Sequence, residues 1–122
     1  MKKILVVDDQ VEVRDLVEVT LRNESFDIIK SDNGKEAVEL AVRECPDLII
    51  MDIMMPGELD GLDATRKIKN NEETKNCKII MLTAKGQQFD RSRGFEAGAD
   101  EYFVKPFSPL DLIRKVEEVV EN

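Results

Sequence analysis

The chain has 122 residues, a formal net charge of −8 and 42% hydrophobic residues, which fit one globular domain. The acidic balance argues against direct nucleic-acid binding, which needs a basic face, and against an anionic membrane surface. No apolar run approaches the roughly 18 residues of a membrane helix, and Asp8 comes too early for a signal peptide. We therefore expect a cytoplasmic protein that binds neither nucleic acid nor membrane.

The first half of the chain predicts two strands, each followed by an amphipathic helix. The strands are short continuous apolar runs, which is typical of strands covered on both faces. An Asn33-x-x-Glu36 sequence resembles a capping box and marks the start of the second helix. In chain order the elements are the strand Ile4–Val7, a helix with Val13, Leu16, Val17, Thr20 and Leu21 on its apolar face, a strand around Ile28–Ile29, and a helix with Ala37, Val38 and Ala41 on its apolar face.

The second half predicts three more strands, each again followed by a helix. The last helix has a strong start signal, because Ser108 can cap it, Pro109 suits its first position and Asp111 complements its dipole. The helix before it has a poor apolar stripe, which fits either a mobile element or an ordinary polar surface helix. In chain order the elements are the strand Leu48–Met51, a helix from about Leu62 to Lys69, the strand Ile79–Leu82, a helix over about 89–97, the strand Tyr102–Val104, and a helix with Ile113, Val116 and Val120 facing the core.

This alternation predicts an α/β fold, a doubly wound five-stranded parallel sheet with helices on both faces. The expected architecture is flavodoxin-like (βα)5 with strand order 2-1-3-4-5. We expect residues 1–122 to form one domain that ends at the fifth helix, with no output domain. Cys45 and Cys77 lack metal-ligand spacing, and the sequence has no histidine, so we expect two reduced thiols.

Polar residues follow four of the predicted strands at their carboxyl ends. Asp8 and Asp9 follow the first strand, Asp52 the third, Thr83 the fourth and Lys105 the fifth. In a parallel sheet these ends lie at one edge, and the first and third strands flank the switch point where α/β proteins place their sites. Each residue alone is more simply a cap, a turn residue or a solvated charge. The set together predicts a functional site.

Three carboxylates in one cleft repel one another and need positive charge beside them. Hard oxygen ligands without cysteine or histidine select Mg²⁺ over zinc, and Lys105 adds a second positive charge. A cation, an ammonium, a hydroxyl and backbone N–H groups around one carboxylate can hold a phosphoryl group. The same arrangement lets Asp52 attack phosphorus as a nucleophile.

At this point the whole chain resembles the CheY-like receiver domains of response regulators, in the stand-alone, single-domain form. The segments that carry the resemblance are Ile4–Asp9, Pro46–Pro56, Asp60-Gly61, Leu82-Thr83-Ala84 and Gly98–Phe107. The resemblance implies that Asp52 is the phosphoacceptor of a two-component system. Asp9 and Asp52 would bind Mg²⁺ with the backbone carbonyl of Met54, and Asp8 would assist through water.

The resemblance also implies how the switch works. Lys105 and the backbone N–H groups of Met54 and Ala84 would contact the phosphoryl oxygens, and the Lys105–Pro106 bond would be cis. Thr83 and Tyr102 would be the switch pair. The phosphoryl group would come from a sensor histidine kinase or a phosphotransfer protein. Phosphorylation would change the binding of a downstream protein through the face formed by the fourth helix, fifth strand and fifth helix.

The sequence departs from the family pattern in one loop. Pro56–Gly61 has one residue more than the usual spacing, which leaves the start of the third helix open, while Pro56 keeps its distance from Asp52. The positions that tune dephosphorylation in the family hold Met54 and Lys85 here. Neither is a water-positioning acid or amide, so we expect slow intrinsic loss of phosphate.

Two rival functions remain open from the sequence. An aspartate-nucleophile phosphohydrolase would turn over phosphate esters, but that chemistry places two acids two residues apart after the first strand, whereas Asp8 and Asp9 are adjacent. A degenerate receiver would bind partners constitutively and form no acyl phosphate. A flavin-binding protein would need a Ser/Thr- or Gly-rich phosphate loop after the first strand, and this sequence has none there. The favoured interpretation is a switch that is not an enzyme, apart from its own phosphorylation and weak autodephosphorylation.

Overall fold

The computed structural model describes residues 1–22, 24–84 and 88–121, with backbone alone at 84 and 88–91. One sheet has the order β2-β1-β3-β4-β5, and all neighbouring strands are parallel. This confirms the predicted fold. The elements are β1 (Lys3–Val7), α1 (Val11–Arg22), β2 (Asp27–Ser31), α2 (Gly34–Glu44), β3 (Leu48–Asp52), α3 (Gly61–Lys69), β4 (Lys78–Ala84), α4 (Gln88–Ala97), β5 (Glu101–Lys105) and α5 (Pro109–Val120).

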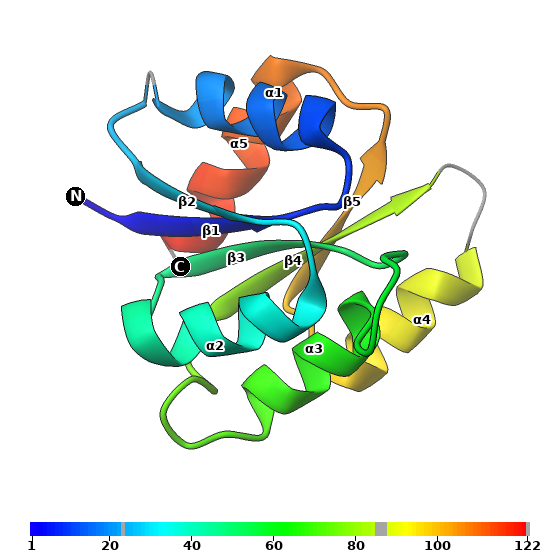
Figure 1. The fold of residues 1–122 in the computed structure, drawn as a ribbon. Coiled ribbons are helices and arrows are strands. Elements are labelled where there is room, and N and C mark those ends of the chain that lie inside the picture. The colour runs from blue at the N-terminus through cyan, green and yellow to red at the C-terminus, as the bar shows by residue number, and fades with distance from the viewer. Residues whose placement is uncertain (23, 85–87, 122) are drawn as a thin grey trace.

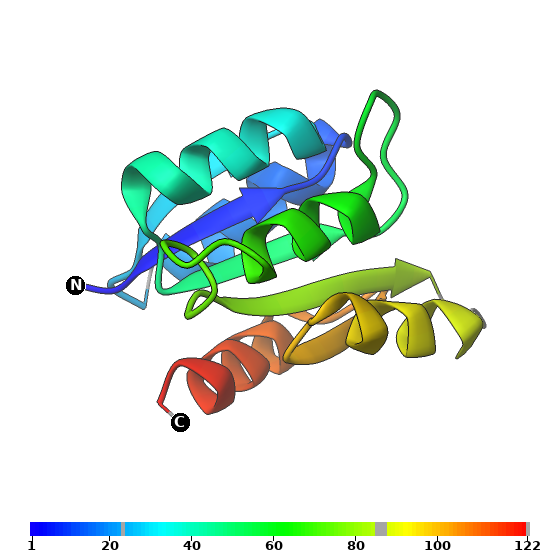
Figure 2. The ribbon, with the colours of Figure 1, turned by 90° about the horizontal axis from the view of Figure 1, so that it is seen from below.

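The helices cover both faces of the sheet. α1 and α5 lie on one face, and α2, α3 and α4 lie on the other (Figure 1). The view in Figure 2 has α2, α3 and α4 in front of the strands. Within the described residues, none of the helices combines the length and apolar character needed to cross a membrane.

Alternation along the strands divides the core between these two faces. Leu5 and Val7 pack in the cluster with α2 and α3, whereas Ile4 and Val6 pack in the cluster with α1 and α5. In β3, Ile49 likewise packs in the first cluster, whereas Leu48 and Ile50 pack in the second. Since side chains on a strand point alternately to opposite faces, continuous apolar strands are required to fill both layers.

Side-chain caps fix the starts of α2 and α5. Oδ1 of Asn33 accepts from the Glu36 amide at 2.8 Å, and Oγ of Ser108 accepts from the Asp111 amide at 3.1 Å. These bonds satisfy amides that have no partner within the helix. Only half of the predicted capping box forms at α2, because the Asn33 amide donates to Oγ of Ser31 at 3.4 Å.

Two details of the predicted helices change in the structure. Leu16 was expected on the apolar face of α1, but it is 42% exposed, because the buried side of the helix runs through Val17, Thr20 and Leu21. The start of α3, which the longer loop left open, is Gly61. Oδ1 of Asp60 caps it by accepting from the Asp63 amide at 2.9 Å.

Candidate functional site

The acidic and basic side chains of the site come from the carboxyl ends of β1, β3 and β5, at one edge of the sheet. Asp52 ends β3, Lys105 ends β5 and Asp8 directly follows β1. Each continues the alternation of the residues that face α1 and α5, such as Val6 before Asp8 and Ile50 before Asp52. The pleat of the strands therefore directs all three side chains to the same side of the sheet.

The structure brings four of the predicted residues together. Carboxylate oxygens of Asp8, Asp9 and Asp52 all lie within 4.8 Å of one another. The Lys105 ammonium lies 2.8 Å from Oδ2 of Asp8 and 3.4 Å from Oδ1 of Asp52. Asp8 is fully buried and Asp52 is 6% exposed, while Asp9 is exposed at the rim.

Burial and crowding of charge control the ionisation of this cluster. Burial, and then the charge of Asp8, raise the pKa of Asp52 from 3.8 to about 7, although the Lys105 ammonium opposes the shift. Burial also disfavours the charge of Lys105, but the carboxylates of Asp8 and Asp52 outweigh it and raise the pKa of the amine. The Lys105 ammonium therefore compensates the carboxylates only in part.

The donor atoms fit a hard divalent cation. Oδ2 of Asp8 is buried and, among the described residues, accepts no hydrogen bond, so its one close partner is the Lys105 charge. Carboxylate oxygens of three acids converge here, and among the described residues this cluster contains no sulfur or imidazole ligand. Such oxygen ligands suit Mg²⁺. Met54, two residues after Asp52, is 68% exposed.

The predicted switch residues lie next to this cluster. Asp52 pairs with Leu82 across the sheet, so Thr83 lies one residue further along β4, where it is buried and in register with Val104. Tyr102 lies on β5, and its ring packs edge-on against Phe95 of α4, with centroids 5.9 Å apart. The Lys105–Pro106 bond is cis.

Two residues of the predicted site are described incompletely or not at all. Ala84 ends β4 in register with Lys105, and its backbone alone is described. Lys85, one of the two positions assigned to dephosphorylation, lies outside the described residues.

The longer loop after β3 leaves the cluster intact. Gly57 takes a left-handed φ of 108° within the loop. The Gly61 amide then donates to the Ile53 carbonyl at 2.9 Å, which returns the chain to the end of β3. A side chain at Gly61 would meet the Asp52 carbonyl oxygen at 2.0 Å. The extra residue is therefore absorbed in the loop, before the chain reaches the site again.

One contact of the site was not predicted from the sequence. Nη1 of Arg14, in the first turns of α1, donates to the backbone carbonyl of Asp8 at 2.7 Å. A single basic residue on an amphipathic helix gives no pattern that distinguishes it from a solvated charge. Its position five residues after Asp9 is the only signal in the sequence.

Comparison with known proteins decides the family. Residues 4–117 match the response regulator receiver domain. The chain belongs to this family. It is 45% identical over 120 residues to the transcriptional regulatory protein ResD of Bacillus subtilis, and 43% identical over 120 residues to SrrA of Staphylococcus aureus. These matches cover 98% of the chain but 48% of each relative, so this receiver domain spans about half the length of the curated relatives it matches.

Solved receiver domains have the same fold. The receiver domain of a sensor histidine kinase from Pseudomonas aeruginosa, which holds a magnesium ion in its active site cleft, has a TM-score of 0.91 and 34% identity. The Vibrio cholerae chemotaxis protein CheY4 has a TM-score of 0.91 and 30% identity. The matches cover 99% and 98% of this chain, respectively, and 98% of each of those chains. The chain is thus the receiver domain of a two-component response regulator.

Proposed function

We propose that the chain is a phosphorylation-dependent switch in which Asp52 accepts the phosphoryl group. The observation that carries this proposal is the Lys105 ammonium, placed 2.8 Å from Asp8 and 3.4 Å from Asp52. A fixed cation beside a nucleophilic carboxylate neutralises phosphoryl oxygens while the new bond forms. The proposed donor is the phosphohistidine of a sensor histidine kinase or of a phosphotransfer protein.

In the proposed transfer, a carboxylate oxygen of Asp52 bonds to phosphorus while the phosphorus–nitrogen bond of the donor breaks. The imidazole nitrogen keeps the electron pair. Asp9, Asp52 and the backbone carbonyl of Met54 would hold Mg²⁺, with Asp8 acting through water. When bound, Mg²⁺ supplies neutralisation of the phosphoryl charge.

The residues that surround Asp52 would then hold the product. Lys105 would contact the phosphoryl oxygens with its ammonium, and the backbone N–H groups of Met54 and Ala84 would donate to them. The transfer occurs once per protein molecule, so we propose a switch that performs its own phosphorylation and slow dephosphorylation, not an enzyme with steady turnover.

Thr83 and Tyr102 would convert the phosphate into a change of surface. Phosphorylation adds about −1.5 to −2 charge, which would draw the Thr83 hydroxyl towards the phosphate and let Tyr102 move into the vacated space. The edge-on contact of Tyr102 with Phe95 supports this path, because it connects β5 to α4. A two-state element formed by α4, β5 and α5 would then bind a downstream protein in one state.

Further properties of the chain support the same proposal. A cavity of about 330 Å³ along β5 and α5 is lined by residues that include Tyr102, Phe107 and Lys115, and it offers a surface to a protein partner. Both cysteines are free thiols, which supports a cytoplasmic location. The proposal treats residues 1–122 as one receiver domain.

The decisive test is chemical phosphorylation of the purified protein. The protein is incubated with acetyl phosphate and Mg²⁺, and its intact mass is measured. We expect one added phosphate, which does not form when a chelator removes Mg²⁺ and is absent from Asp52→Asn. Lys115→Met, which removes a surface ammonium from α5, serves as the control and should be phosphorylated normally. Steady release of inorganic phosphate from a phosphate ester would favour a phosphohydrolase instead, and absence of any adduct would favour a constitutive binding module.

A further inference from the structure

The turn that joins β1 to α1 is held by the side chain of Arg14. Its Nη1 atom donates to the backbone carbonyl of Asp8 at 2.7 Å. α1 begins at Val11, so this bond bridges from the helix back over the turn that contains Asp8 and Asp9. A hydrogen bond from a charged donor is stronger than one between neutral groups.

Every polar group of Asp8 has a partner in the structure. Its amide donates to the Ser31 carbonyl at 3.1 Å, its Oδ1 accepts from the Gln10 amide at 2.9 Å, and its Oδ2 faces Lys105 at 2.8 Å. The carbonyl is the one group of this set whose partner lies within α1. Loss of that bond would leave the carbonyl of a fully buried residue without its charged donor.

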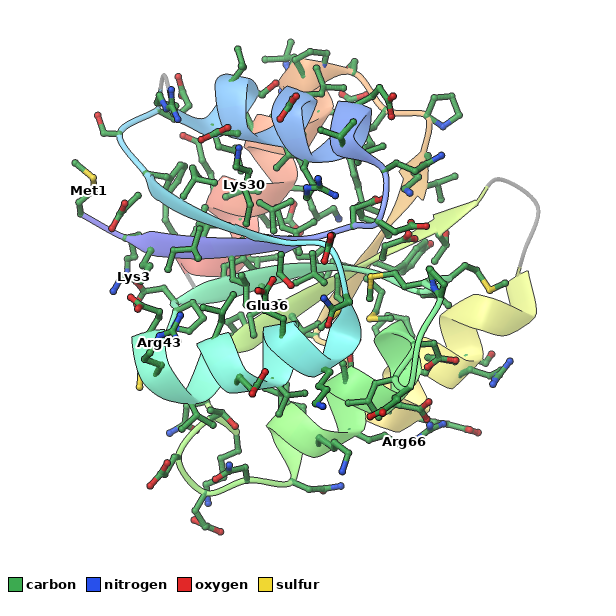
Figure 3. The ribbon with its side chains drawn as sticks, in the orientation of Figure 1. Met1, Lys3, Lys30, Glu36, Arg43 and Arg66 are labelled. Atoms are coloured by element: carbon green, nitrogen blue, oxygen red, sulfur yellow. The ribbon has the colours of Figure 1, made fainter. Side chains whose placement is uncertain are left out.

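The Arg14 guanidinium hydrogen-bonds this carbonyl although the chain is rich in acidic residues. The sequence has 26 Asp and Glu residues, yet among the described side chains the Arg14 guanidinium forms no ion pair with a carboxylate. Acidic side chains are nevertheless near, because Arg14, Asp15, Asp32 and Glu36 line one cavity of about 320 Å³. Glu36 is labelled in Figure 3, at the start of α2. The guanidinium is therefore directed inwards to the backbone.

We propose that Arg14 is a positioning residue for the acidic pair, and that the affinity for Mg²⁺ depends on its bond to the Asp8 carbonyl. The inference rests on the proposed function, because it assumes that Asp8 and Asp9 serve a cation. Arg14 acts through the backbone that presents these carboxylates and does not itself touch the cation. Partners that orient metal ligands in this way typically contribute about 10- to 100-fold to metal affinity.

Loss of the Arg14 charge and loss of its hydrogen bond should change the affinity for Mg²⁺ in opposite directions. Removal of a cation beside an acidic site makes the local potential more negative, so a pure charge effect would tighten the binding of Mg²⁺. Removal of the hydrogen bond releases the turn and would weaken it. The direction of the change therefore separates the two explanations.

The test compares Mg²⁺ affinity by titration calorimetry in wild type, Arg14→Met, Arg14→Lys and Arg22→Met, at a temperature where all four are folded. Arg22 lies on the same helix and pairs with Glu18, so its variant removes an equal charge without touching the turn. We expect the Kd of Arg14→Met to rise about tenfold, Arg14→Lys to restore most of the affinity, and Arg22→Met to bind like wild type.

A second measurement needs no metal. Amide hydrogen exchange at Gln10, whose N–H is held by Asp8 Oδ1, should be faster in Arg14→Met than in wild type and unchanged in Arg22→Met. The inference is overturned if wild type binds Mg²⁺ and Arg14→Met binds it equally or more tightly. Failure of wild type to bind Mg²⁺ would overturn the proposed function itself, together with the inference.

Discussion

The ammonium of Lys105 lies 2.8 Å from Oδ2 of Asp8, a carboxylate that is fully removed from solvent. The two residues are 97 positions apart, and the parallel order of β1, β3 and β5 alone brings them to one edge. This ion pair places the Lys105 ammonium closer to Asp8 than to Asp52, from whose Oδ1 it lies 3.4 Å. It also leaves Asp52 only partly compensated, which gives the site a marked dependence on pH.

Mg²⁺ should bind more tightly as pH rises. Because burial and the Asp8 charge raise the pKa of Asp52 to about 7, a proton competes with the cation below that pH. We expect the Kd to rise towards tenfold per pH unit below about 6, with a proton released on binding. Titration calorimetry at pH 6 and pH 8 in two buffers checks both quantities. Asp52→Asn should bind weakly at either pH, and equal wild-type affinity at the two pH values would contradict the prediction.

Asp52→Asn should stabilise the metal-free protein above pH 7. The folded-state pKa of Asp52 lies above its unfolded value of 3.8, so the wild-type free energy of unfolding falls as pH rises from about 4 to about 7. The neutral amide avoids that loss. We expect a gain of about 1–2 kcal/mol at pH 8, since solvent at the open rim screens part of the repulsion. Urea unfolding across this pH range measures it.

The control variant, Glu44→Gln, should change the free energy of unfolding in the opposite direction. A hydrogen bond from Lys3 lowers the pKa of Glu44, so the stability contributed by that carboxylate is present at neutral pH and is lost as pH falls. Lys3, which is labelled in Figure 3, begins β1, whereas Asp8 directly follows that strand, so the two lie at opposite ends of it. Glu44→Gln should therefore destabilise the protein at pH 8. A less stable Asp52→Asn at pH 8 would show that the Asp52 charge is better compensated than we infer.

Lys105→Met should make the protein dependent on Mg²⁺ for part of its stability. Without the ammonium, Asp8 and Asp52 face each other uncompensated, which we expect to lower the free energy of unfolding by about 2–3 kcal/mol at pH 8 without metal. Millimolar Mg²⁺ should restore more stability to this variant than to wild type. The matched control is Lys115→Met, whose surface pairs lie at 3.6 and 4.0 Å and should contribute less than about 1 kcal/mol. Equal loss in both variants would sink the prediction.

The site could be located from the sequence because the order and direction of the strands determine which residues meet. Once the strands are parallel and ordered, residues that directly follow them share one edge, so Asp52 and Lys105 could be placed together without coordinates. The Arg14 bond could not be found that way, because it depends on the rotamer of a long side chain. Leu16 was misplaced for a related reason, since periodicity defines an apolar arc but not which of its margins the sheet covers.

Gly61→Ala should disturb the site through the backbone. A Cβ atom at this position would lie 2.0 Å from the Asp52 carbonyl oxygen and 2.8 Å from Cα of Ile53. Backbone atoms cannot rotate away, so we expect a loss of about 2–3 kcal/mol of stability and weaker Mg²⁺ binding. In the control Gly94→Ala, the new atom would meet the Met81 side chain, with Cγ at 3.4 Å and Cβ at 3.9 Å. That variant should retain its stability and Mg²⁺ affinity, as measured by thermal unfolding and calorimetry.

The lifetime of the aspartyl phosphate should depend on Met54. Met54 follows Asp52 by two residues and is 68% exposed, and a thioether is too weak an acceptor to orient a water for attack on phosphorus. We expect purified phosphoprotein to persist for minutes or longer, and Met54→Asn to lose phosphate several-fold faster because an amide can position that water. Because the side chain is exposed, the substitution should leave the fold and Mg²⁺ affinity unchanged. Intact mass followed over time after removal of acetyl phosphate gives the rate, and a wild-type lifetime of seconds would contradict the assignment.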